Sequence, residues 1–425
     1  MTSELSDSLW HATCRDRVSA PVLTGDRQAD VVIVGGGYTG LSAALCAAQQ
    51  GAKACLVEGR EFGGGGSGRN VGLTNAGLWL PPEDINARLG KAAGDRLSAI
   101  LGGAPDLVYQ LIAQHGIACE PVRGGTLHCA HAAAGMEDLK RRHAQLSAIG
   151  APVSLLSRDE AISRVGSDRV HGAIFDPRAG TIQPLAYANG LARAAMEQGA
   201  ELFEHSPAKT ITHDGKNWCV TTPKGRISAP AMIVATNAYA IPTKGLASPD
   251  LVPVHYFQAA TAPLSPQQRG RILPGGEGCW DTAMVMSSWR LDQEGRLIIG
   301  GMGRLNHPAG GIHRRWLDRK LAQMFPELAG TKLTHAWFGR IAMTAEYLPK
   351  IQDLGQNALM VFGYSGRGIG PGTVFGQEMA RAVLTQSHTD LPIAPVTEHS
   401  YPLAGVREAY YEAGATLTHF LKSRW

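Results

Sequence analysis

Residues 30–58 read DVVIVGGGYTGLSAALCAAQQGAKACLVE, and this stretch predicts a strand–helix–strand unit. The β-branched run 30–34 is typical of a strand that is buried on both faces. Apolar residues then recur at helical spacing over 41–48, Gly51 ends the helix, and 52–57 read as a second strand. Because such crossovers are right-handed, the two strands are expected to lie parallel in one sheet.

The turn between the first strand and the helix reads G-x-G-x-x-G over residues 35–40. Its first glycine allows the tight turn, its second lets a pyrophosphate approach the backbone, and its third lets the helix pack closely on the strand. An acid at the end of the next strand is the residue type that holds ribose hydroxyls, and a carboxylate there disfavours the 2′-phosphate of NADP. The predicted dinucleotide contacts are Gly35, Gly37, Tyr38, Thr39, Gly40 and Glu58.

Residues 62–72, FGGGGSGRNVG, permit two interpretations. Their composition is that of a flexible linker. Their position, four residues after the predicted ribose acid, instead favours a loop whose backbone lies against a cofactor without Cβ clashes. The βαβ unit by itself leaves FAD and NAD open.

Several segments together resemble the D-amino-acid-oxidase superfamily of flavoenzymes, and in particular the branch of the bacterial γ-glutamylputrescine oxidases and their pipecolate-oxidising relatives. The matching segments are SLW near Ser8, ADVVIVGGGYTGLSAAL (29–45), the GSGRN loop, AGTIQPLAYANGLARAA (179–195), MIVATNAYA (232–240), GRLIIGG (295–301) and GYSGRGI (363–369). This resemblance spans nearly the whole chain and implies FAD as the cofactor.

The resemblance implies further FAD contacts from two loops. In the first loop Ser67 is expected to hydrogen-bond a phosphate, Arg69 to neutralise one and Asn70 to face the isoalloxazine ring, although solvated turn residues remain an alternative. In the second loop, before a helix, Arg367 is expected to stabilise the reduced flavin by its charge, the alternative being an exposed arginine. The remaining predicted contacts are Gly66, Asn237, Gly366, Gly368 and Ile369.

Relatives that attach FAD covalently do so through Cys or His at positions where this chain has neither. No Cys follows Cys279, and no His lies between Gly59 and Arg88. Non-covalent FAD is therefore expected.

The substrate residues are expected to include a cation, because a carboxylate is best held by the two-pronged guanidinium of arginine. The resemblance points to Arg340, with Tyr364 beside the second loop and Arg290 ahead of a strand as further candidates. Each has a structural alternative, such as a salt bridge for Arg340. His255 and Tyr256 are candidates for the cavity wall.

The expected fold class is α/β (α+β overall), in which a Rossmann-type FAD-binding domain is interleaved with a strand-rich substrate domain. Strands are expected at 125–129, 218–222, 231–235, 296–301 and 358–362, and helices at 94–115, 136–149, 184–198, 312–325 and 373–384. We assign 1–80, 157–245 and 335–390 to the FAD-binding domain, 81–156 and 246–334 to the substrate domain, and 391–425 to a C-terminal extension.

Composition excludes several other classes. A formal net charge of +4 over 425 residues, with no long basic run, gives little support for nucleic-acid binding. Seven cysteines without a CxxC pair and a polar N-terminus without a signal peptide predict a cytoplasmic protein. The uncharged run 31–48 contains three adjacent glycines, so no integral membrane segment is expected. Fifteen histidines show no ligand spacing, so no metal is expected.

These features together predict an FAD-dependent oxidase of the C–N bond in a small amine or amino acid, with O2 as the electron acceptor and H2O2 as a product. The best candidate substrates are γ-glutamyl diamines and cyclic secondary amino acids such as L-pipecolate. A quinone or another acceptor is an alternative, because 297–303 lacks the lysine that some oxidase relatives carry. An NAD(P)H-linked flavin reductase or hydroxylase and a non-catalytic FAD-binding protein are further alternatives.

Overall fold

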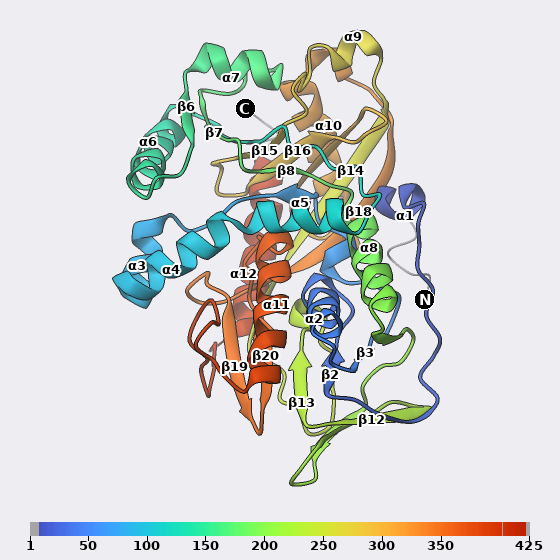
Figure 1. The fold of residues 1–425 in the computed structure, drawn as a ribbon. Coiled ribbons are helices and arrows are strands. Elements are labelled where there is room, and N and C mark those ends of the chain that lie inside the picture. Colours follow the sequence, from blue (N-terminus) through green and yellow to red (C-terminus); the bar gives the residue numbers. More distant parts are fainter. Residues whose placement is uncertain (1–7, 402, 422–425) are drawn as a thin grey trace.

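The computed structural model describes residues 8–401 and 403–421, whose two largest sheets face each other across a cavity. Figure 1 shows one sheet in the lower half of the molecule and the other in the upper half. Residues 1–7, part of the stretch examined for a signal peptide, and the last four residues of the predicted C-terminal extension lie outside the described residues.

The lower sheet has six strands in the order β19-β20-β13-β2-β3-β9. β2 pairs in parallel with β3, Val31 opposite Ala54, as the βαβ pattern predicts. Only the edge strand β19 is antiparallel to its neighbour. The strands are β2 (Val31–Val34), β3 (Ala54–Val57), β9 (Glu201–Phe203), β13 (Ala231–Val234), β19 (Lys350–Gly355) and β20 (Ala358–Phe362).

Helices cover one face of the six-stranded sheet and a small four-stranded mixed sheet covers the other. The helices α2 (Tyr38–Gln49), α8 (Pro184–Glu197) and α11 (Ile369–Thr385) lie side by side and share one apolar core with the sheet (Figure 1). On the opposite face, a second core packs against four strands, namely β1 (Gly25–Gln28), β10 (Thr210–His213), β11 (Trp218–Thr221) and β12 (Gly225–Ala229). Because β2 is apolar at all four positions, it fills both cores.

The upper sheet has eight strands in the order β18-β14-β17-β16-β15-β5-β7-β6. One of its faces packs against α10 (Gly310–Met324) through an apolar core that includes Trp316 and Phe257. The strands are β5 (Thr126–Cys129), β6 (Ser154–Leu156), β7 (Ala173–Asp176), β14 (Val252–Pro263), β15 (Gly278–Asp281), β16 (Ser287–Leu291), β17 (Arg296–Met302) and β18 (Leu333–Met343).

The remaining elements connect and cover these layers. The helices are α1 (Leu9–Thr13), α3 (Pro82–Leu89), α4 (Lys91–Gly102), α5 (Ala104–Gln114), α6 (Ala133–Ala148), α7 (Arg158–Val165), α9 (Pro266–Arg269) and α12 (Ala404–Leu421). Short 3-10 helices span Gly66–Gly68, Asn237–Tyr239 and Pro326–Leu328, and β4 (Leu73–Thr74) pairs with β8 (Gly180–Thr181).

The interleaved fold class is confirmed, but three of the predicted assignments differ from the structure. β7, predicted within the FAD-binding segment 157–245, pairs with β5 and β6 in the eight-stranded sheet. β18, predicted within 335–390, pairs with β14 in the same sheet. The predicted helix 94–115 is two helices, α4 and α5, separated at Gly103. Both helices contribute to the core of the six-stranded sheet rather than to the substrate domain.

Within the described residues, none of the helices is long and apolar enough to cross a membrane.

Candidate functional site

The main cavity has a volume of about 720 Å3 and is walled by both sheets. We call the walls from the six-stranded sheet and its following loops the nucleotide side; they include Gly35–Thr39 and Glu58. We call the opposite wall the aromatic side; the eight-stranded sheet contributes Tyr256, Trp280 and Met302, and other segments add Trp79, Arg142 and Tyr347. The volume lies in the range of about 300–1,000 Å3 that is usual for small-molecule and cofactor sites.

On the nucleotide side, the turn from β2 to α2 has no room for side chains. Gly35 has φ +112°, and a Cβ on it would lie 2.9 Å from the carbonyl oxygen of Ala235. A Cβ on Gly40 would lie 1.9 Å from the carbonyl oxygen of Gly35, so α2 packs directly on the turn. Gly40 itself lies behind the wall, where it sets the closeness of helix and strand, as the motif predicts.

Glu58, at the end of β3, is held in one orientation by two backbone amides. Its Oε2 accepts a hydrogen bond from the Gly36 N–H (2.7 Å) and its Oε1 accepts one from the Arg60 N–H (2.8 Å). Burial raises the pKa of this carboxyl above its ordinary value, and the two amide hydrogen bonds partly offset the rise. Each carboxylate oxygen can still accept from a further donor, such as a ribose hydroxyl.

The glycine-rich loop 62–72 is ordered, so the linker interpretation is wrong. The Oγ of Ser67 accepts a hydrogen bond from the Tyr38 N–H (3.0 Å), at the start of α2. The Nδ2 of Asn70 donates to the Tyr38 hydroxyl (3.0 Å) and to the carbonyls of Gly66 and Ser67, while its Oδ1 accepts from the Gly72 N–H. Asn70 lines the cavity while its amide holds the loop, and that it faces the flavin ring stays a prediction.

Arg69 is 4% exposed and connects this loop to the other sheet. Its Nε donates to the Gly64 carbonyl (3.1 Å) and its Nη1 to the Phe338 carbonyl on β18 (3.4 Å). Its own carbonyl accepts from the Trp337 indole N–H (3.0 Å). Arg69 lines the cavity, and a phosphate contact from it stays a prediction.

The second glycine loop, between β20 and α11, closes the cavity next to the first. The Gly363 N–H donates to Oδ1 of Asn237 (3.0 Å), which couples this loop to the loop after β13. The hydroxyls of Tyr364 and Thr39 are hydrogen-bonded to each other (2.8 Å), and burial raises the pKa of Tyr364. The Tyr364 hydroxyl is therefore already engaged, so a direct bond from it to substrate stays a prediction. Gly366, Arg367, Gly368 and Ile369 all line the cavity.

Arg367 points from this loop toward the aromatic side rather than to solvent. Its Nη1 donates to the Ala76 carbonyl (2.6 Å), and its guanidinium lies 5.2 Å from the ring centre of Trp280. Burial and the nearby Arg142 lower its pKa to about 10, so it is protonated at neutral pH. The alternative of an exposed arginine is wrong.

Arg340, on β18, lines the cavity beside the first glycine loop. Its guanidinium lies 4.7 Å from the ring centre of Tyr239, whose hydroxyl accepts from the Arg340 N–H (2.9 Å). The register places it opposite His255, on the strand face opposite the neighbouring Gly339 and Ile341. Its role as a substrate ligand stays a prediction.

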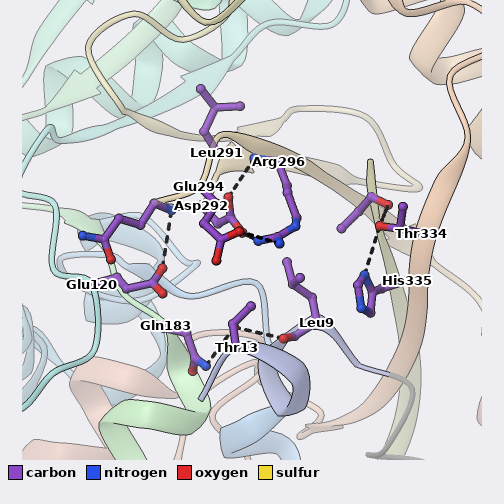
Figure 2. A network of polar contacts seen from close by, with 12 residues as sticks. Leu9, Thr13, Glu120, Gln183, Leu291, Asp292, Glu294, Arg296, Thr334 and His335 are labelled. Carbon is purple, nitrogen blue, oxygen red and sulfur yellow. Dashed lines mark hydrogen bonds and ion pairs between the residues drawn. The ribbon is translucent and has the colours of Figure 1, made fainter. Parts of the chain in front are cut away.

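Arg290 lies outside the cavity lining, and its prediction as a substrate ligand is not supported. It is 1% exposed and donates hydrogen bonds to the carbonyls of Gly72 (3.1 Å), Ile182 (2.6 Å) and Leu291 (3.0 Å). Figure 2 shows the adjoining turn, in which Arg296 pairs with the Asp292 carboxylate (2.9 Å). Arg290 therefore ties the first loop to the eight-stranded sheet.

Sequence reasoning missed most of the aromatic side. Tyr256, whose hydroxyl bonds Ser288 (2.8 Å), was a candidate, but Trp79, His128, Arg142, Trp280 and Tyr347 were not singled out. The alternation of apolar and polar residues along β5 and β15 was the signal available for two of them. Among the residues that the structure describes, no group of three or more His, Cys, Asp or Glu side chains is arranged to hold a metal ion.

The residues present fit FAD. Gly35, Gly36 and Gly37 line the cavity in a turn that is too tightly packed for a Cβ, at the N-terminus of a helix whose first N–H groups have no intrahelical acceptor. Glu58 is positioned for a ribose, and the cavity continues to a second helix N-terminus at Ile369. A dinucleotide with a ring system at its far end matches this layout.

This parallel sheet, glycine turn and fixed acid define a dinucleotide-binding protein. The model of the FAD dependent oxidoreductase (DAO) family matches residues 30–382. The chain belongs to this family of FAD-dependent oxidoreductases, so the predicted family, the enzymatic nature and the FAD cofactor are confirmed.

Individual relatives agree with this assignment. The chain is 31% identical to the "Probable oxidoreductase OrdL" of Rhizobium meliloti (strain 1021), over 89% of each chain. It is 28% identical to the gamma-glutamylputrescine oxidoreductase of Escherichia coli (strain K12), over 86% of each. The glycine oxidase structure from Geobacillus kaustophilus superposes with a TM-score of 0.72 at 21% identity, covering 88% of this chain and 100% of that one. That superposition supports the fold.

Proposed function

We propose that this enzyme oxidises the C–N bond of a small amine or amino acid. The observation that carries the proposal is the main cavity itself, which joins an FAD cradle to an aromatic wall next to Arg367. FAD, when bound, supplies a hydride acceptor for the carbon next to the amine nitrogen. The similarity to a gamma-glutamylputrescine oxidoreductase supports an amine substrate.

The residues of the chain position the substrate and stabilise charge, and they do not act as a general acid or base. Tyr256, Trp280 and Met302 present apolar surface that excludes water from the reacting carbon. The N-terminus of α11 and the protonated Arg367 favour negative charge near the second glycine loop. The amine reacts unprotonated, and the resulting imine is hydrolysed by water. γ-Glutamyl diamines and cyclic secondary amino acids such as L-pipecolate remain the best candidate substrates.

Anaerobic stopped-flow mixing of the FAD-loaded enzyme with amines and, separately, with NADH or NADPH tests this proposal. Bleaching of the flavin absorbance by an amine is expected. Bleaching by NADH or NADPH alone would show a reductase or hydroxylase instead, and no bleaching by either would indicate an FAD-binding protein without this activity.

A dehydrogenase that uses a quinone or another acceptor is the second candidate for the reoxidation step. The observation that favours it is the absence of lysine from 297–303, on β17, which lines the aromatic side at Met302. Measuring peroxide release against reduction of an artificial quinone with the same amine separates the two. Peroxide equal to the amine consumed supports the oxidase, whereas turnover only with the quinone supports the dehydrogenase.

A further inference from the structure

A second cavity of about 70 Å3, here called the side cavity, adjoins the main cavity at its aromatic side. Three arginines line it, Arg142, Arg178 and Arg367. The two cavities have five lining residues in common, and these five residues lie between them. The shared residues are Asn75, His128, Arg142, Trp280 and Arg367.

The charges around the side cavity do not balance. Arg142 pairs with the Asp138 carboxylate (2.7 Å), and Arg178 forms a two-pronged pair with the Asp176 carboxylate (2.9 and 2.7 Å). Arg367 has no carboxylate within ion-pair distance among residues 8–401 and 403–421. Arg367 lines both cavities and its charge has no acidic partner there, so its guanidinium can hold an anionic group in the side cavity by charge-assisted hydrogen bonds.

Polar atoms of the lining residues also lack partners. Asn75 Oδ1, Ser98 Oγ and Thr126 Oγ1 are buried without a hydrogen bond in the structure. The hydroxyls of Ser98 and Thr126 can donate to an anion, whereas Asn75 Oδ1 can only accept and needs a donor such as water. The wall also contains the Asp176 carboxylate, which is paired with Arg178, and apolar side chains such as Leu97 and Leu101 that suit the methylene groups next to a charged end.

Strand alternation builds this wall. Thr126 and His128 on β5 face the cavity side, whereas Leu127 and Cys129 face the apolar core under α10. Trp280 lies opposite His128 in the register of β15, and the two rings stack with their centres 5.0 Å apart. Burial and the nearby Arg142 and Arg367 lower the pKa of His128 well below its ordinary value, so this ring adds no charge.

We propose that the side cavity, with Arg367 as its anchor, binds a carboxylate that the substrate carries several bonds away from the carbon that is oxidised. This inference rests on the proposed amine oxidation and narrows its substrate class to amines with a remote carboxylate. A cavity of about 70 Å3 holds roughly five water-sized groups, enough for a carboxylate and its neighbouring methylene. Arg340 lies outside the side cavity, on β18 against Tyr239, so a substitution of Arg340 is the matched control for a substitution of Arg367.

Titration calorimetry of the FAD-loaded enzyme tests the proposal with a series of ω-amino carboxylates, from 3-aminopropanoate to 6-aminohexanoate, each against its neutral amide. In the wild type at least one carboxylate is expected to bind about ten-fold or more tightly than its amide, since hydrogen bonds to charged groups contribute on this scale. Arg367→Gln is expected to abolish this preference and Arg367→Lys to restore part of it, whereas Arg340→Gln is expected to retain it. The proposal would be overturned if the wild type bound every carboxylate and its amide equally, or bound neither detectably. It would also be overturned if only Arg340→Gln lost the preference for the carboxylate.

A second variant covers the case in which Arg367→Gln fails to fold or to retain FAD. Ser98→Leu fills the side cavity from α4 and keeps all three arginines. It is expected to remove the carboxylate preference, and a full preference in Ser98→Leu would contradict the proposal. Anaerobic bleaching by the same compounds separates this outcome from failure of the proposed function. If amides and carboxylates bleach the flavin equally, the carboxylate site in the side cavity is rejected but amine oxidation is not. If none of the amines bleaches the flavin, amine oxidation is rejected.

Discussion

The nucleotide side of the main cavity is made of backbone, whereas the aromatic side is made of side chains. On the nucleotide side, glycines 35 to 37 expose main chain, and Glu58 is fixed by two backbone amides. On the aromatic side, Tyr256 and Trp280 present rings from separate strands, and the Arg367 guanidinium points toward them from the second glycine loop. A backbone cradle suits a ligand common to a family, while a wall of side chains can differ from one member to the next.

The largest effect is expected at Gly40, where α2 packs directly on the backbone of the glycine turn. Gly40→Val places a Cβ 1.9 Å from the Gly35 carbonyl oxygen and forces α2 away from the turn. We expect a destabilisation of about 3 kcal/mol or more and loss of bound flavin. Thermal unfolding and the flavin-to-protein absorbance ratio measure both effects.

Gly59→Ala is the control, because its Cβ would make an ordinary 3.5 Å contact with Pro207, in the cavity wall behind which Gly40 lies. If Gly40→Val kept its flavin as well as Gly59→Ala does, close packing of α2 on the turn would not be required for binding.

Glu58→Gln is expected to weaken FAD binding by about 10- to 100-fold, because hydrogen bonds from ribose hydroxyls to a carboxylate are charge-assisted. The amide also cannot accept from both the Gly36 and Arg60 N–H groups, as the carboxylate does. Quenching of flavin fluorescence gives the dissociation constant. An unchanged constant would remove Glu58 from the ribose site.

FAD affinity is also expected to depend on pH through Glu58. Burial raises the pKa of this carboxyl in the free protein, and ribose hydroxyls that donate to the charged form lower it again in the complex. Affinity is therefore complete above the raised pKa and falls as the pH is lowered through it. Dissociation constants measured across acidic pH should show this fall in the wild type. The same decline in Glu58→Gln would assign it to another group.

Trp280→Leu is expected to act on the amine and not on FAD. It removes the ring that stacks on His128 and faces Arg367, which contributes about 1–2 kcal/mol, so kcat/KM for the amine should fall about 5- to 30-fold. Steady-state kinetics at saturating FAD measures the change. A higher dissociation constant for FAD with unchanged amine kinetics would show that Trp280 acts on the cofactor and not on the amine.

The smallest effect is expected for Tyr364→Phe. Its hydroxyl is hydrogen-bonded to Thr39 at the start of α2, so its loss should reduce stability by about 1 kcal/mol and change the amine KM less than about two-fold. Denaturant unfolding and amine kinetics test both values. A ten-fold rise in KM with unchanged stability would restore Tyr364 as a substrate ligand.

The nucleotide side could be predicted from the sequence because its signals are local. The strand, turn and helix of residues 30–58 and the acid at Glu58 form one continuous pattern, and only the packing at Gly40 needed coordinates for its distance. The loop 62–72 was ambiguous by composition, and the hydrogen bonds of Asn70 and Ser67 settle that it is ordered.

The aromatic side could not be predicted in the same way, because its residues meet only through sheet topology. His128 and Trp280 become neighbours because β5 pairs in parallel with β15, and Arg142 arrives from α6. The resemblance predicts Arg367 at the cofactor loop, and the structure places it on the cavity wall. Arg290 was predicted as a substrate ligand, and only the fold shows that it holds backbone carbonyls instead.

Anaerobic flavin bleaching against amine concentration, with Glu58→Gln and Trp280→Leu compared at saturating FAD, tests the division of the cavity most directly. Once it is saturated with FAD, Glu58→Gln should match the wild type at every amine concentration, whereas Trp280→Leu should bleach more slowly or need more amine. Slower bleaching in saturated Glu58→Gln together with wild-type behaviour in Trp280→Leu would contradict the division of the cavity into a nucleotide side and a substrate-binding aromatic side.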